Sequence, residues 1–161
     1  MATTPLPTPG FKVDQVKFLE SRIVSFQMEN QLSAADQKRL TGFDYSITSG
    51  QDVDLSKKII RVRIGASIRA TLKGDTDKKL VGEIKTETVF QIKELAKLMV
   101  KHPDGALSLP DQIGGTVLGL AYSTTRGMVL ALSAGTCLGK AFLPVINPVR
   151  LLQAAKVEVT A

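Results

Sequence analysis

One stretch of strict alternation constrains the fold of this chain more than any other feature of its sequence. From Ile59 to Leu72, apolar side chains occupy the even positions, while most odd positions are polar or basic. Side chains of a β-strand point alternately to opposite faces, so a period of two indicates a long strand with one face in a core and one in water. Gly74, Asp75 and Asp77 then favour a turn, and a second alternating run from Leu80 to Lys93 predicts an antiparallel hairpin.

Two earlier segments have the same character and are expected to join this hairpin. Apolar residues alternate from Val16 to Met28, although Glu20 and Arg22 interrupt the pattern, which a β-bulge would explain. A shorter alternation follows at residues 43–48. The segment Gln31–Leu40 between them is either one helical turn or a polar connection. The sequence thus predicts four antiparallel strands before residue 94, with one apolar face that needs a cover.

The next part of the chain is expected to be helical. Residues 94–101 are a candidate for a short helix, which Pro103 would end because a residue before proline avoids the helical region. From Gln112 to Gly139 the only charge is Arg126, which splits the run into two pieces of about 13 residues. A bilayer crossing needs about 20 apolar residues, so each piece is too short, and a long buried helix is the better interpretation.

Small residues recur at every fourth position of this helix. The stripe consists of Gly115, Gly119, Ser123, Gly127, Ala131 and Gly135. A glycine costs about 1 kcal/mol of helix propensity relative to alanine, so a run of them suggests a compensating gain from close packing. The stripe is therefore a candidate seam, either against the sheet or against the same helix of a second subunit. The alternative is a broken, glycine-rich helix without a special partner.

Prolines shape the C-terminal part. After Lys140, Pro144 and Pro148 forbid a continuous helix, which predicts an apolar crossover followed by a short C-terminal helix. The expected organisation is a flexible, Pro-rich tail at residues 1–14, a single domain at 15–153 and a C-terminal tail at 154–161, which could instead add a short strand. The fold class is α+β: a four-stranded antiparallel sheet, a long helix, a Pro-containing crossover and a short helix.

Composition argues against an enzyme. Cys137 and His102 are the only residues of their kind, which makes a disulfide framework, a Cys or His metal site and a Ser-His-Asp triad improbable. The segment Gly135–Lys140 is similar to a phosphate-binding loop but is one residue short and lacks the Ser or Thr that binds magnesium. We expect no catalytic residue, no metal and no cofactor. The N-terminus also lacks the features of a secretory signal.

The positive charge is concentrated in one part of the chain. The net charge is +6, and residues 57–101 contain 12 basic residues against 5 acidic ones. Arg61, Arg63 and Arg69 are expected on the solvent face of one strand, where they could bind nucleic acid or another polyanion. No aromatic side chains are interleaved with them, so recognition by base stacking is not supported. The alternative is an ordinary solvated face.

The C-terminal half resembles the SecB family of bacterial export chaperones. That family has an aromatic residue and an Arg early in its main helix, and a Pro-Val-Asn or Pro-Ile-Asn crossover about 21 residues later. Here Tyr122 and Arg126 precede Leu143-Pro144-Val145-Ile146-Asn147 with the same spacing from Arg to Asn. The family's Pro before its Arg is absent, and Pro148 stands where an aromatic residue usually follows the Asn. The resemblance covers about residues 15–152, and only this stretch is specific.

The resemblance implies a cytoplasmic, ATP-independent chaperone that is a homo-oligomer, a dimer or tetramer, and that holds unfolded clients in apolar grooves. The client could be a dedicated one, such as an antitoxin. SecB docks the SecA motor through an acidic sheet face, whereas an Arg-rich face is expected here, which argues against that partner. The competing hypotheses are a polyanion-binding module and a purely structural subunit. Apolar character and position suggest these client-binding residues: Phe43, Tyr45, Tyr122, Phe142, Leu143, Val145, Ile146, Val149 and Leu152.

Overall fold

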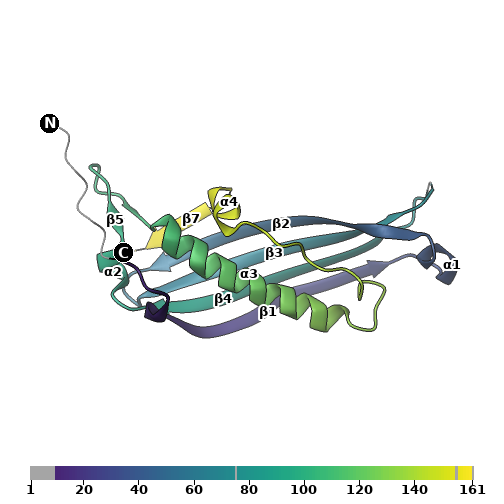
Figure 1. The fold of residues 1–161 in the computed structure, drawn as a ribbon, viewed down its shortest axis with the longest axis horizontal. Helices are drawn as coiled ribbons and strands as arrows, with labels where there is room; N and C mark the ends of the chain where they lie inside the picture. The colour runs from purple at the N-terminus through teal and green to yellow at the C-terminus, as the bar shows by residue number, and fades with distance from the viewer. Residues whose placement is uncertain (1–9, 75, 155, 161) are drawn as a thin grey trace.

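One five-stranded sheet with a long helix across one face forms the body of the protein (Figure 1). The structure is a computed structural model that describes residues 10–74, 76–154 and 156–160. The strand order is β1-β4-β3-β2-β7, and all neighbours are antiparallel except β7, which runs parallel to β2. The strands of this sheet are β1 (Val16–Asn30), β2 (Leu40–Asp54), β3 (Ile59–Leu72), β4 (Leu80–Ile92) and β7 (Lys156–Thr160).

Helices and short turns connect and cover the strands. The main helix α3 lies diagonally across the sheet, with α1 near one end of the sheet and α2 near the other (Figure 1). A two-stranded hairpin of β5 and β6 leads into α3. The bounds are η1 (Val13–Gln15, a 3-10 turn), α1 (Ala34–Gln37), α2 (Leu95–Leu98), β5 (Val100–Lys101), β6 (Leu107–Ser108), α3 (Asp111–Ser133) and α4 (Pro148–Gln153).

The alternating residues of β3 form the sheet side of the core, as the sequence predicts. The even residues from Ile60 to Ala70 are all buried beneath α3, whereas odd residues such as Arg63 and Arg69 are exposed. From the helix side, Val117, Leu118 and Ala121 complete the same core. Burial of apolar surface at about 25 cal/mol per Å² drives this association of helix and sheet. The predicted α+β class, with a four-stranded antiparallel sheet, a long helix, a crossover and a short helix, is confirmed, and β7 adds a fifth strand.

The irregular strand β1 contains the bulge that its sequence suggests. Its register against β4 shifts between Phe18 and Glu20 and again between Ile23 and Ser25. Each shift inserts one residue, Leu19 and Val24, and thereby restores the apolar side chains that follow to the covered face. The two polar interruptions are therefore compatible with one continuous strand of 15 residues.

The connection between β1 and β2 is a helical turn. Ser33 caps α1: its side chain accepts a hydrogen bond from the Asp36 backbone N–H, and the Asp36 carboxylate accepts from the Ser33 backbone N–H. Lys78 from the β3–β4 turn lies 2.7 Å from the same carboxylate. Hydrogen bonds from Lys78 and Ser33 hold the pKa of Asp36 well below its usual range. One carboxylate thus joins two loops at this end of the sheet.

We expect Asp36→Asn to destabilise the protein at neutral pH but not in strong acid. Because the folded pKa of Asp36 is lowered, its stabilising contribution is complete above the unfolded value of about 3.9 and disappears as the pH falls through the folded value. Urea unfolding between pH 2 and 7 would show the two proteins converging below about pH 4. Asp14→Asn is the control on an exposed carboxylate. A difference independent of pH would contradict the assignment.

Three segments differ from the sequence-based expectation or extend it. The helix expected at residues 94–101 is shorter: α2 is a single turn, and Met99 is already extended, because residues 100–101 pair with residues 107–108 in the β5–β6 hairpin. The C-terminal residues 156–160 form a strand, one of the two possibilities left open. Of the expected N-terminal tail, residues 1–9 lie outside the described part, and Val13–Gln15 forms a 3-10 turn.

Candidate functional site

Both tyrosines of the chain fix the crossover between α3 and α4. The Tyr122 hydroxyl donates to the carbonyl oxygen of Pro144 at 2.7 Å. The backbone N–H of Phe142 donates to the Tyr45 hydroxyl oxygen at 3.1 Å. Burial raises the pKa of Tyr122, so its hydroxyl stays protonated as a donor at neutral pH. The two halves of the SecB-like motif, Tyr122 and the Pro-containing segment, are therefore in direct contact.

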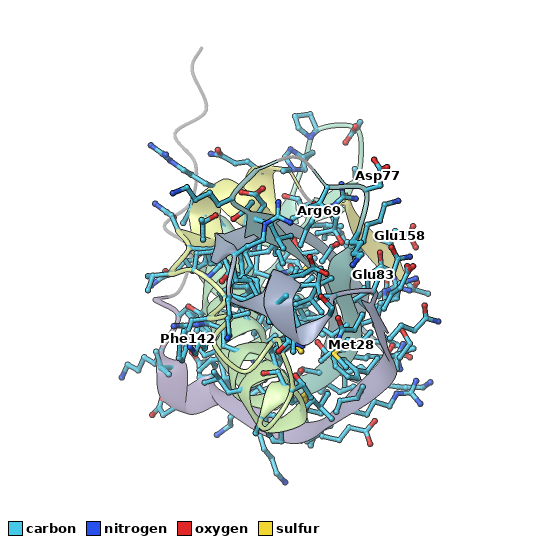
Figure 2. All side chains as sticks on the ribbon, turned by 90° about the vertical axis from the view of Figure 1, so that its right-hand side faces the viewer. Met28, Arg69, Asp77, Glu83, Phe142 and Glu158 are labelled. Atoms are coloured by element: carbon cyan, nitrogen blue, oxygen red, sulfur yellow. The ribbon has the colours of Figure 1, made fainter. Side chains whose placement is uncertain are left out.

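This fixation divides the crossover into an inner and an outer set of side chains. Leu143 points inward and is 3% exposed, and Ala141 is fully buried. Phe142 and Val145 point outward, with 61% and 85% of their surface exposed. Figure 2 shows Phe142 on the opposite side of the molecule from Glu83 on β4. An exposed Phe between two buried residues is held in place by its neighbours, which makes it available to a partner.

The short helix α4 ends this segment in a defined direction. Asn147 caps it, because the Asn147 side chain accepts from the backbone N–H groups of Val149 and Arg150 at 3.0 and 3.4 Å. Pro148 occupies the first helical turn, where a missing N–H carries no cost. Val149 remains exposed and Leu152 is buried against the core. The start of α4 therefore explains, by local structure alone, why asparagine and proline stand at positions 147 and 148.

The predicted client-binding residues thus fall into three groups by exposure. The exposed group is Phe142, Val145 and Val149. Leu143, Leu152 and Tyr122 are buried, so they cannot contact a client in this conformation. Phe43, Tyr45 and Ile146 are partly buried against the core. Spacing alone could not separate these groups, because a crossover has no fixed period that assigns a face.

Two hollows flank the crossover. One, of about 610 Å³, lies between the start of β2 and the loop after α3, and is lined by Leu40, Phe43, Cys137, Lys38 and Lys140 among others. The other, of about 380 Å³, lies between α3 and the crossover, where Gly115, Gly119, Ile146 and Pro148 form an apolar lining with Arg126 at its border. The helix expected over the run Gln112–Gly139 ends at Ser133, so Cys137 lies in the loop that follows and is partly exposed.

The small-residue stripe divides into a packed part and an open part, and it ends early. Gly115 and Gly119 face α4: a Cβ built on Gly119 would lie 3.3 Å from Cγ of Pro148. Near Gly127 there is open space, and Ala131 is exposed. Gly135 lies outside the helix, with φ at +75°, because α3 ends at Ser133. The first part of the stripe therefore packs within the chain, and only Ser123, Gly127 and Ala131 remain as candidates for the expected seam.

We expect Gly119→Leu and Gly127→Leu to have different effects. At Gly119 the added side chain meets Pro148, so α4 must shift, and the free energy of unfolding should fall by about 1–3 kcal/mol. At Gly127 an added Cβ has no neighbour within 4 Å among the described residues, and the loss of a helical glycine should leave the fold equally or more stable. Denaturant unfolding measures both. Equal destabilisation at the two positions would contradict this packing.

The open face of the sheet carries charges of both signs. Arg61, Arg63 and Arg69 share this face, but Arg63 pairs with Asp52 at 2.6 Å and Arg61 lies 3.5 Å from Glu87. By register, β1 to β4 place six basic and seven acidic residues on it. The six are Lys17, Arg22, Arg61, Arg63, Arg69 and Lys85, and the seven are Glu20, Glu29, Asp44, Asp52, Asp54, Glu83 and Glu87. The three arginines share the open face as expected, but that face is not net basic, because strand pairing places carboxylates among them.

An apolar surface on β1 was missing from the sequence-based list. Strand β1 is at the edge of the sheet, and Phe18 is 52% exposed although its ring makes an edge-to-face contact with Phe90. Ile23 and Met28 on the same face are also exposed. On the outer side of α3, Leu120 and Leu130 add further exposed apolar surface. The sequence contained an indication of this edge position, because an alternating strand that charged residues interrupt is typical of an edge strand.

Comparison with solved structures identifies the architecture. A Mycobacterium tuberculosis SecB-like chaperone, Rv1957, solved in complex with a ChAD peptide from the Rv1956 HigA1 antitoxin, superposes with a TM-score of 0.58 over 83% of this chain and 91% of that chain. The fold is SecB-like. Sequence identity to that SecB-like protein is only 16%. The sequence matches no protein-family model, and no curated protein matches it.

A second solved structure is more distant from this SecB-like fold. It is a protein of unknown function from Streptococcus agalactiae, with 9% identity and a TM-score of 0.36 over 81% of this chain and 96% of that chain. A likeness of that degree carries no inference. Among the described residues of the SecB-like chain, no three His, Cys, Asp or Glu side chains lie so that they could hold a metal ion. None of the described helices combines the length and apolar character that a membrane crossing requires.

Proposed function

We propose that this protein is an ATP-independent holdase that binds unfolded or partly folded polypeptides along its crossover. The observation that carries the proposal is the outward set of the crossover, above all Phe142 and Val145, which the anchored neighbours Leu143 and Pro144 hold exposed. Apolar side chains that the fold holds exposed to water in this way indicate a surface that binds an apolar partner. The SecB-like fold supports the same conclusion, and the solved relative carries a bound peptide.

The chemistry of the surface suits weak binding of many sequences. Burying one large apolar side chain contributes about 1.5–3 kcal/mol, so a few contacts give only modest affinity. Several copies of the site on one oligomer would raise the overall affinity without any new contact. Burial of apolar surface would supply the energy for holding, and the client's own folding would supply the energy for release.

A homo-oligomer is part of the proposal. Phe18, Ile23 and Met28 on the edge strand β1 form an exposed apolar surface, and in the described part of the chain no strand pairs with the outer edge of β1 beside it. A second copy of the chain would cover both. Light scattering should therefore give a mass that is a multiple of 17.3 kDa, and Ile23→Lys should lower it. A monomeric mass for the unchanged chain would remove the oligomer from the proposal.

The function is tested with a chemically denatured client. The protein at stoichiometric amounts should suppress the aggregation of diluted, denatured citrate synthase without ATP, and the native protein should bind a hydrophobic dye. A purely structural subunit would do neither, because its crossover would be sealed in a permanent assembly. Unchanged aggregation curves at a tenfold excess of the protein would refute the holdase. Binding of nucleic acid gains no support from the charge-balanced sheet face.

A further inference from the structure

The outer edge of β2 is only half occupied. Strand β7 pairs with Gly50–Asp54, so Leu40–Ser49 has β3 on one side and, among the described residues, no strand on the other. The backbone N–H of Leu55 donates to the carbonyl oxygen of Thr160 on the β7 side. Because backbone directions alternate along a strand, the N–H groups of Tyr45, Ile47 and Ser49 point outward on that same side.

No segment among residues 10–74, 76–154 and 156–160 pairs with this open stretch on its outer side. The crossover passes nearby, but its hydrogen bond to β2 joins the Phe142 backbone to the Tyr45 side chain, and no described backbone–backbone hydrogen bond joins the two segments. The open stretch spans about 33 Å at 3.3 Å per residue, which is enough for an added strand of ordinary length. The edge therefore offers a row of free donors and acceptors.

The side chains beside this edge determine which kind of added strand would fit there. Phe43, Tyr45 and Ile47 lie on the face that α3 covers and are only partly buried. Phe142 adds an exposed ring at the same place. At the start of β2, the residues that line the hollow of about 610 Å³ include Lys38 and Lys140. An apolar strand with an acidic end fits this combination of an apolar flank and two ammonium groups.

We propose that an extended client segment with apolar residues and an acidic end adds to β2 as a sixth strand along Leu40–Ser49. Strand β7 demonstrates that this edge accepts an added strand, and the new strand would continue the same edge. Backbone hydrogen bonds do not depend on the client's sequence, and every second side chain of the client would pack against the apolar flank. Many clients can therefore bind in one geometry. The inference rests on the proposed holdase function and specifies how its client is held.

Amide hydrogen exchange tests the geometry directly. The probe is a blocked ten-residue peptide that alternates Val with Thr and has Glu at both ends. When it binds, the N–H groups of Tyr45, Ile47 and Ser49 should become protected at least tenfold, whereas those of Asp44, Ser46 and Thr48, which point toward β3, should not change. Side-chain binding alone would not produce this alternation. Methylation of the six central amides of the peptide, which leaves its side chains unchanged, should weaken binding at least tenfold.

Charge reversal tests the acidic end. Lys38→Glu with Lys140→Glu should weaken binding of the peptide about fivefold at low salt, whereas Lys93→Glu with Lys101→Glu, at the other end of the sheet, should not. If the protein suppresses aggregation of denatured citrate synthase but shows no alternating protection, the strand addition is wrong and the holdase function stands. If neither the peptide nor denatured citrate synthase is bound, both proposals fail.

Discussion

A chain with Asp in place of both Phe142 and Val145 should lose most of its ability to keep an unfolded client soluble. Each side chain is mainly exposed, so each can transfer its apolar surface from water to the client, at about 1.5–3 kcal/mol per side chain. Asp removes that gain and adds a charge whose burial under an apolar client is costly. We expect the concentration for half-maximal protection of denatured citrate synthase to rise by more than tenfold.

The fold of this double variant should remain intact, which makes the result a test of function. Surface substitutions away from caps and strained positions usually change stability by less than about 0.5 kcal/mol. The matched control is Asp at Val13 and Val100, two exposed valines elsewhere in the chain, which should leave protection unchanged. If both pairs reduced protection equally, net charge and not the crossover would account for the effect.

Leu143→Ala should have the largest effect on stability among the crossover residues. Leu143 is buried between the two residues that the tyrosines hold, so its removal leaves a cavity under the crossover. Such a substitution typically lowers the free energy of unfolding by about 2–5 kcal/mol. Chemical unfolding followed by circular dichroism would measure the loss.

The neighbouring Val145→Ala is the control for this prediction. Val145 is the most exposed large apolar side chain among the described residues, and its truncation should change stability by less than about 0.5 kcal/mol. If Leu143→Ala were equally mild, the crossover would not be anchored, and the fixed exposure on which the holdase proposal depends would lose its basis. Client protection at low temperature separates the two roles, because Leu143→Ala should retain it while folded.

The fold could be predicted where a local period determines a face. The even residues of β3 are buried because adjacent side chains on a strand must point to opposite faces. The two-residue period of Ile59–Leu72 identifies which residues belong to the buried face. The bulges of β1 could also be inferred, since Glu20 and Arg22 break the parity of an otherwise apolar strand. The buried part of α3 followed from the absence of charge around Arg126.

Features that depend on pairing between distant segments could not be predicted in this way. The charge of the open face depends on the register that places Asp52 and Glu87 beside Arg61 and Arg63. The stripe of small residues continues past the last helical residue in sequence but not in structure, because Gly135 turns the chain at a positive φ. The division of the crossover into buried and exposed residues depends on two tyrosine contacts across 22 and 97 positions of sequence.

The pair of tyrosines that fixes the crossover also makes it optically visible. The chain contains no tryptophan and no other tyrosine, so its tyrosine fluorescence comes entirely from Tyr45 and Tyr122. Both hydroxyls are engaged by the crossover backbone, at Phe142 and Pro144. Any movement of this segment would therefore change the intrinsic fluorescence without a label. A client that contains tryptophan would accept excitation energy from the two tyrosine rings, and its tryptophan emission would then show that it is bound near the crossover.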